Sequence, residues 1–278
     1  MFLSPKETVE AYINASVAKT KLSTDKVIGK SIFAGMMIAM GAACSNVAVH
    51  AIDNVGVARL VAGTVFPVGL MMVILMGAEL FTGDCLMAQA VSDKKISGLA
   101  FARVLVLVYL GNFIGGFLTA ALMYLSGQFN YSAGRLGAYT IKVAMAKVSL
   151  TPVQGISSGI LCNILVCAAV LMAMSSKDVT GKLWASFFVI MPFVTGGFEH
   201  CVANMYYITA GLLAKSDPSY VDAAANVYGL TDLANLSIKG FLVNNLIPVT
   251  IGNIIDGSIC VGLPMYFLNY RESKKKDK

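Results

Sequence analysis

The chain has 278 residues, of which 57% are hydrophobic and only 13% are charged, and its formal net charge is +6. A soluble domain carries about 25% charged residues, so this composition excludes an ordinary water-soluble protein and indicates an integral membrane protein. The Lys and Arg residues are concentrated at the chain ends and in short loops, which is typical of membrane topology and does not indicate nucleic-acid binding.

Residues 1–24 predict an amphipathic helix on the cytoplasmic side of the membrane. Ser4 can cap this helix, Pro5 suits its first turn and Glu7 occupies the capping-box position. The apolar residues that share one face of the helix are Val9, Tyr12, Ile13 and Val17. The segment lacks the continuous apolar core of a signal peptide. We expect it either to pack under the membrane domain or to cover the mouth of a pathway.

Residues 25–270 predict one all-α domain with six transmembrane helices. The uncharged stretches cover residues 31–52, 60–78, 104–134, 148–176, 183–198 and 240–255. Most of them reach the ~20 residues that cross a bilayer, and the shorter ones continue beyond a single acidic residue. A basic cytoplasmic tail follows at residues 271–278.

Six spans place both chain ends on the same side of the membrane. That side holds 15 Lys and Arg residues, against six on the opposite side. Because positively charged residues favour the cytoplasmic side, both termini are predicted to be cytoplasmic, in a multi-pass protein of the inner (cytoplasmic) membrane.

Two of the spans are interrupted by the same motif. Gly-x-Glu occurs at residues 77–79 and again at residues 197–199, at a depth where a membrane helix is most hydrophobic. Lipid cannot satisfy open backbone groups, so a helix breaks there only where protein or a water-filled cavity covers the break. Two matching breaks therefore indicate a polar path through the membrane, flanked by helix ends.

The two halves of the chain repeat one another. Residues 111–116 resemble residues 252–257, and residues 32–35 resemble residues 156–159. Together with the two breaks, these pairs occur in the same order in each half. An odd number of spans per half forces the halves into opposite orientations. The sequence therefore predicts two inverted three-helix repeats with two broken helices and a site near the midplane.

Four polar residues are candidates for this site. His200 follows the second break and is the mid-membrane side chain that ordinarily titrates near neutrality, although a packed structural histidine is the alternative. Thr82 offers a neutral donor or a local backbone bond. Asn163 could orient His200, contact a passing ion or bond another helix. Lys147 could concentrate anions at the outer mouth or be a solvated loop charge.

Glu79 and Glu199 occupy equivalent positions in the two breaks. Carboxylates exposed to an anion pathway would repel the anion. We expect them instead to support the breaks by accepting bonds from the free backbone N–H groups, with proton transfer as the alternative role.

The electrostatic pattern favours a channel for small monovalent weak-acid anions. Moving a bare ion out of water costs on the order of tens of kcal/mol. Half-helix N-termini and neutral donors lower that cost, and a protonatable His200 adds either a switchable charge or a proton for the anion itself. Exposed carboxylate rings or carbonyl cages, which a cation path needs, are not evident.

Other functions stay open at this point. An aquaporin-like channel for neutral solutes shares broken helices, although Asn-Pro-Ala is absent from both breaks. A proton-coupled anion symporter would use the same residues. A thiol-based enzyme needs an activated nucleophile, and Cys201 cannot face its neighbour His200 on a helix. We therefore predict no catalytic residues, and the six cysteines lack metal-ligand spacing, so neither a metal nor a cofactor is predicted.

Several long segments together resemble one known family. They are residues 77–83, 159–168 and 198–205, supported by residues 109–112 and 245–253. On these segments the chain resembles the formate/nitrite transporter family over nearly its whole length. The resemblance implies a homopentamer in the lipid bilayer, with an aquaporin-like protomer and one pore in each, that conducts formate, nitrite or hydrosulfide.

The resemblance also implies roles along the pore. The central polar group it assigns consists of Thr82, Asn163 and His200, and its outer lysine is Lys147. The apolar constrictions it assigns are Phe66, Leu70, Leu80, Phe81 and Phe193. The chain is closest in appearance to the hydrosulfide branch, so hydrosulfide is the first expected substrate and formate the second. Asp256 departs from the small or neutral residue expected at its position.

Overall fold

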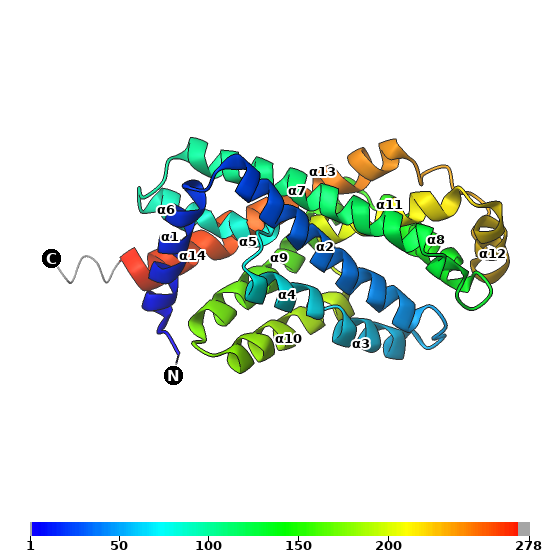
Figure 1. The fold of residues 1–278 in the computed structure, drawn as a ribbon, viewed down its shortest axis with the longest axis horizontal. Helices are drawn as coiled ribbons and strands as arrows, with labels where there is room; N and C mark the ends of the chain where they lie inside the picture. Colours follow the sequence, from blue (N-terminus) through cyan, green and yellow to red (C-terminus); the bar gives the residue numbers. More distant parts are fainter. Residues whose placement is uncertain (1, 272–278) are drawn as a thin grey trace.

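The computed structural model describes residues 2–271, which form helices packed into one elongated bundle and contain no β-strand (Figure 1). Six helices in this part of the chain are long and apolar enough to cross a membrane. They are α2 (Thr24–Val49), α3 and α4 together (Val55–Met76), α7 (Gly98–Leu125), α9 (Pro152–Ser175), α10 (Val179–Gly196) and the segment Gly240–Arg271. The predicted six-span, all-α fold is confirmed.

Both described chain ends lie at the same end of the bundle. α1 (Pro5–Thr20) and α14 (Leu263–Tyr266) lie there, and α12 (Pro218–Tyr228) lies at the opposite end (Figure 1). An even number of spans requires this arrangement. The tail predicted at residues 271–278 falls outside the described residues except for Arg271.

α1 packs on the bundle instead of lying free at a surface. The capping box forms as expected, because the N–H of Ser4 donates to Oε2 of Glu7 at 2.7 Å and the N–H of Glu7 donates to Oγ of Ser4 at 3.3 Å. The apolar face, with Val9, Tyr12 and Ile13 at its centre, is buried against elements that include α9 and α6 (Ala88–Ser92).

Each broken span ends its first half at a glycine in the left-handed conformation. α4 (Val68–Met76) ends at Gly77 with a φ of 64°, and α10 ends at Gly197 with a φ of 73°. This conformation closes a helix C-terminus at no steric cost to glycine. The second halves begin four residues later, as α5 (Phe81–Asp84) and α11 (Cys201–Lys215).

Close helix crossings show the inverted repeat in three dimensions. In the first half α2 packs on α7, and in the second half α9 packs on α13 (Ile247–Ile254). A Cβ atom at Gly35 would lie 2.2 Å from the carbonyl oxygen of Asn112, and one at the equivalent Gly159 would lie 2.7 Å from that of Val249. Both crossings therefore need a residue without a side chain.

The last span continues beyond Asp256, as the sequence predicted. The uncharged stretch ends at residue 255, but the helix runs on to Arg271 with π-helical turns on both sides of α13. A single buried acid interrupts the uncharged pattern without interrupting the helix.

Candidate functional site

The two breaks bring Thr82 and His200 into contact. Oγ1 of Thr82 lies 3.0 Å from Nε2 of His200, and both side chains are buried. Thr82 lies in α5, and His200 is the residue that precedes α11. Since these elements belong to opposite halves of the repeat, the contact marks the centre where the two halves meet.

The hydrogen bonds of His200 define its protonation. Nδ1 accepts the N–H of Ala203 at 3.2 Å, which caps α11. Nδ1 therefore carries no proton, and in the neutral ring Nε2–H donates to the Thr82 hydroxyl. Thr82 then has its own hydroxyl hydrogen left to donate elsewhere. A second proton on the ring would remove the cap and place positive charge at a helix N-terminus, so the geometry favours neutral His200.

Two buried asparagines hold the open backbone at the breaks. Asn112 of α7 accepts the N–H of Phe81 at 3.0 Å and donates to the carbonyl of Glu79 at 3.0 Å. Asn253 of α13 makes the same pair of bonds at the second break, accepting the N–H of Cys201 at 3.0 Å and donating at 3.2 Å to the carbonyl of the Gly-x-Glu glutamate. Each half of the repeat thus uses one asparagine amide to bond an open N–H group and a carbonyl at its break.

The glutamates of the motif do not accept these N–H groups, so that prediction is wrong. Their carboxylates face cations instead. Glu79 pairs with Lys19 at 2.6 Å and Lys30 at 3.7 Å, and Glu199 pairs with Lys147 at 2.9 Å. Neutral amides satisfy the backbone, and a buried carboxylate is better stabilised by a cation than by an N–H group. The glutamates therefore form ion pairs beside the breaks.

Asn163 is hydrogen-bonded to the backbone of Thr82. Its Nδ2 donates to the carbonyl of Asn253 at 2.7 Å and to the carbonyl of Thr82 at 3.3 Å. Of the three roles left open by the sequence, the interhelical hydrogen bond is the one observed, and no bond to His200 occurs among the described residues. Asn163 fixes the backbone that carries the Thr82 hydroxyl.

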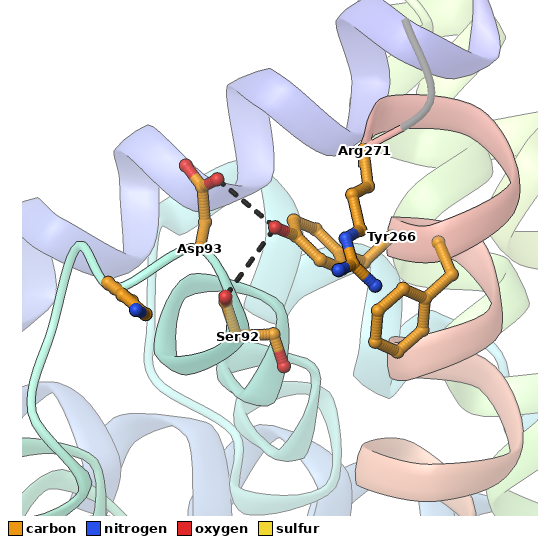
Figure 2. Close-up of a pocket in the computed structure, with 6 residues that line it drawn as sticks. Ser92, Asp93, Tyr266 and Arg271 are labelled. Carbon is orange, nitrogen blue, oxygen red and sulfur yellow. Dashed lines mark hydrogen bonds between the residues drawn. The ribbon is translucent and has the colours of Figure 1, made fainter. Parts of the chain in front are cut away.

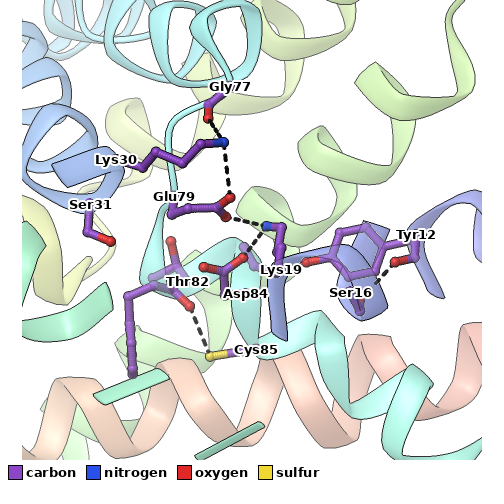
Figure 3. A network of polar contacts seen from close by, with 12 residues as sticks. Tyr12, Ser16, Lys19, Lys30, Ser31, Gly77, Glu79, Thr82, Asp84 and Cys85 are labelled. Carbon is purple, nitrogen blue, oxygen red and sulfur yellow. Dashed lines mark hydrogen bonds and ion pairs between the residues drawn. The ribbon is translucent and has the colours of Figure 1, made fainter. Parts of the chain in front are cut away.

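A polar network ties α1 to the first break (Figure 3). The Tyr12 hydroxyl donates to the carbonyl of Gly83 at 2.7 Å, and the Lys19 ammonium contacts both Asp84 and Glu79. Burial opposes the charge of Lys19, but Asp84 and the other groups around it outweigh burial and raise the pKa of Lys19 well above its usual value. Lys19 therefore stays charged.

Removing the charge of Lys19 is expected to destabilise the protein. In Lys19→Met, the buried carboxylate of Asp84 loses the only cation that pairs with it within residues 2–271. Breaking a buried pair in this way costs about 3 kcal/mol or more. The double variant Lys19→Met/Asp84→Asn should regain most of that stability. Thermal unfolding in detergent measures both.

The control is Lys21→Met, which removes an exposed lysine from the end of the same helix. It should leave the melting temperature close to that of the unchanged protein. An equal loss in Lys19→Met and Lys21→Met would contradict a specific role for the Lys19–Asp84 pair.

A cavity of about 660 Å³ opens at the end of the bundle opposite to the chain ends, and His200 forms part of its wall. The basic residues that line it are Arg59, Arg135, Lys142 and Lys147, and the acidic ones are Asp53 and Glu199. Lys147 lies in the last turn of α8 (Arg135–Val148), beside Glu199 and 5.1 Å from the ring of Tyr207. It is therefore a largely buried helix residue, and the solvated loop charge is excluded.

Known proteins are similar to the chain over most of its length. A family model described as formate/nitrite transporter matches residues 6–267. The chain belongs to the formate/nitrite transporter family. It is 41% identical over 220 residues to the formate channel FocA of Haemophilus influenzae, covering 77% of this chain and 75% of that protein. It is 35% identical to the probable formate transporter of Methanothermobacter thermautotrophicus, over 97% of each chain.

Solved structures of this formate/nitrite transporter family are similar as well. A structure described as a pentameric formate channel with formate bound has a TM-score of 0.78 and 32% identity, and the match covers 88% of this chain and 97% of that one. An FNT family ion channel has a TM-score of 0.82 and 25% identity, covering 94% and 98%. The chain is therefore a multi-pass membrane transport protein and not an enzyme.

The apolar residues that the family resemblance assigned to constrictions divide into two groups. Phe66 and Phe193 form an edge-to-face pair with ring centroids 5.5 Å apart, and both line the cavity of about 660 Å³ beside His200. The other three are buried but do not line that cavity, and they are Leu70, Leu80 and Phe81. Leu80 and His200 are counterparts in the repeat, since each directly precedes the second half of a broken span.

A second cavity, of about 450 Å³, lies at the end of this family member that holds its chain ends (Figure 2). The hydroxyl of Tyr266 donates to Oδ1 of Asp93 at 3.2 Å and to the carbonyl of Ser92 at 3.5 Å. These bonds tie the end of α6 to α14. Lys94 and Arg271 also line the cavity, so both ends of the protein present basic groups.

Sequence reasoning did not identify Asn112 and Asn253 as functional residues. Both lie in Gly-Asn pairs that served as evidence of a repeat and of the family resemblance, without a role for the asparagine itself. The signal was present, because a buried amide that recurs at the same repeat position in a membrane span needs hydrogen-bond partners in both halves. What those partners are depends on the fold.

Proposed function

We propose that this protein is a channel for small monovalent weak-acid anions and that formate is its main substrate. The observation that carries the proposal is the buried contact of Thr82 with His200, where two broken helices meet in a member of this family. Relatives named as formate channels or transporters favour formate over the hydrosulfide that the sequence placed first. Hydrosulfide and nitrite remain further candidates.

In this proposal the central pair supplies neutral donors to the anion. Nε2–H of His200 holds the oxygen of Thr82, so the hydroxyl hydrogen of Thr82 is available to a passing carboxylate. Hydrogen bonds to a charged group are about twice as strong as neutral ones. The N-terminus of α11 adds a positive dipole end next to His200. Such donors stabilise an anion without binding it as tightly as a fixed cation would.

Protonation of the anion provides a second route for a weak acid. In this route His200 takes up a second proton from water and passes it to formate, and the ring returns to its neutral form. Formate then crosses the driest stretch as neutral formic acid, which avoids much of the cost of burying charge. This route makes flux sensitive to pH.

The ends of the pathway would concentrate and select the anion. The cavity beside His200 faces outward in this orientation, and Lys147 and Arg59 in it would raise the local anion concentration, although Glu199 offsets part of the Lys147 charge. Phe66 and Phe193 would form the outer constriction. The inner constriction would consist of Leu70, Leu80 and Phe81. Apolar rings of this kind exclude large hydrated ions.

We also propose that the protein is a homopentamer in the inner membrane with one pore per protomer and both termini in the cytoplasm. The similarity to a pentameric formate channel supports the assembly. The excess of Lys and Arg on the side of the chain ends supports the orientation.

Solute flux into proteoliposomes tests the proposed function. Formate, hydrosulfide and nitrite are compared at equal concentration, with glycerol as a neutral solute and empty liposomes as the control. We expect rapid formate flux and no glycerol-driven swelling. Glycerol permeation without anion flux would overturn the proposal in favour of a neutral-solute channel. Formate accumulation driven by a proton gradient would instead indicate a proton-coupled symporter.

A further inference from the structure

Asp256 is an acidic residue in the interior of a membrane span. It lies midway along Gly240–Arg271, and its side chain is 0% exposed. Neither of its carboxyl oxygens has a hydrogen-bond partner among residues 2–271, and no ion pair in that range includes it. An ionised carboxylate in such a place is far more costly than a neutral acid. The environment therefore stabilises the protonated form.

The backbone next to Asp256 touches the elements that surround the centre of the protein. A Cβ atom at Gly257 would lie 2.5 Å from Cβ of Cys85, 2.7 Å from Nδ2 of Asn163 and 3.3 Å from Sγ of Cys167. The hydroxyl of Ser258 donates to the carbonyl of Cys85 at 3.2 Å. This part of the last span is thus in direct contact with both α9 and the turn that follows α5.

Within residues 2–271, no group on the elements packed against Asp256 offsets a negative charge there. The titratable side chains on the elements packed against it, and on its own span nearby, are Asp84, Cys85, Cys162, Cys167, Cys260 and Tyr266. None of these becomes positively charged. Asp84 already pairs with Lys19, a cation of the polar network around the first break.

Asn163 connects this acid to the proposed pathway. Its Nδ2 donates both to Asn253, three residues before Asp256, and to the carbonyl of Thr82. Its Oδ1 also has no hydrogen-bond partner within residues 2–271. An ionised Asp256 would place a fixed negative charge close to the segment that carries the Thr82 hydroxyl, in a medium that screens charge poorly.

We propose that Asp256 is a proton-binding site that controls anion passage. With the proton bound, the side chain is neutral and anions pass; when the proton leaves, the fixed carboxylate repels them. Flux is therefore high at neutral pH and falls as the pH becomes alkaline. The control of flux rests on the proposed anion-channel function, whereas proton binding by Asp256 does not.

Infrared spectroscopy tests proton binding independently of transport. A protonated carboxyl group gives a C=O band that an ionised carboxylate lacks. We expect this band at neutral pH in the unchanged protein, its disappearance at alkaline pH, and its absence from the difference between neutral and alkaline spectra of Asp256→Asn. A band that is missing from the unchanged protein at neutral pH would overturn the proposal, whatever the protein transports.

Formate flux tests the control. Asp256→Asn keeps the side chain neutral at every pH, and Asp256→Leu does so without a hydrogen-bonding group, which provides a second variant if the first folds poorly. We expect equal flux at neutral pH, and at alkaline pH a flux about tenfold lower in the unchanged protein than in either variant. The cysteines, Asp84 and Tyr266 are present in all three proteins, so the ratio isolates Asp256. A ratio that stays constant with pH overturns the control, and absent formate flux counts against the proposed function instead.

Discussion

His200→Phe is expected to lower formate flux by about 10- to 100-fold, because a hydrogen bond to a charged group contributes about 1.5–3 kcal/mol. Phenylalanine cannot hold the oxygen of Thr82, so the hydroxyl hydrogen is free to turn to a local backbone acceptor and away from the anion. It also leaves the N–H of Ala203 without its acceptor. Formate flux into proteoliposomes measures the effect.

The matched variant is His200→Asn, which separates capping from titration. Asparagine is a favoured N-cap residue, so it should keep α11 capped and leave thermal stability nearly unchanged. It cannot titrate, so any dependence of flux on pH that arises from the imidazole should disappear in both variants. If His200→Asn retained the pH profile of the unchanged protein, the imidazole would have no part in that dependence.

Asn253→Ala is expected to destabilise the protein by about 3–5 kcal/mol, since each buried group left without a partner costs about 1–3 kcal/mol. The substitution removes the acceptor of the Cys201 N–H and the donor to the carbonyls of Gly159 and Glu199. Asn112→Ala should produce a similar loss, because Asn112 makes the equivalent bonds in the other half. The melting temperature in detergent measures both.

Asn269→Ala is the control for these two variants. Asn269 lies on the same last span, but its amide bonds only locally, to Met265 at 3.2 Å. Its replacement should have little effect on the melting temperature. An equal fall in the melting temperature for Asn269→Ala and Asn253→Ala would contradict a specific role for Asn253. A fall in only one of Asn112→Ala and Asn253→Ala would show that the two halves are not equivalent in energy.

Particular residues show how far the sequence could predict this protein. The Gly-x-Glu motifs located both breaks, because only a glycine closes a helix in the left-handed conformation at that depth without strain, as Gly77 and Gly197 do. Thr82 and His200 were predicted to belong to one site, and they are in contact. Both predictions rest on local backbone chemistry combined with the rule that polar groups in a membrane need partners.

The predicted role of the motif glutamates, as acceptors of the free backbone N–H groups, was wrong because it depends on contacts that the sequence does not show. A free N–H group donates to any suitable acceptor within reach, and which acceptors are within reach depends on which helices cross at the break. Asn112 and Asn253 arrive there from other spans, so the carboxylates of Glu79 and Glu199 are left for lysines. Two of these lysines come from distant parts of the chain, since Lys19 lies on α1 and Lys147 on α8.

The sequence by itself determined the number of spans, the two interruptions and the inverted repeat. It also determined that Lys and Arg are in excess on the side of the bundle that holds the chain ends. These features follow from hydropathy, glycine conformation and charge, which act over short stretches of chain. Only the tertiary structure decided which acceptor each open N–H group finds, which nitrogen of His200 carries the proton, and that Asp256 is buried without a partner. Those facts depend on contacts between residues far apart in the chain, and such contacts exist only once the helices have packed.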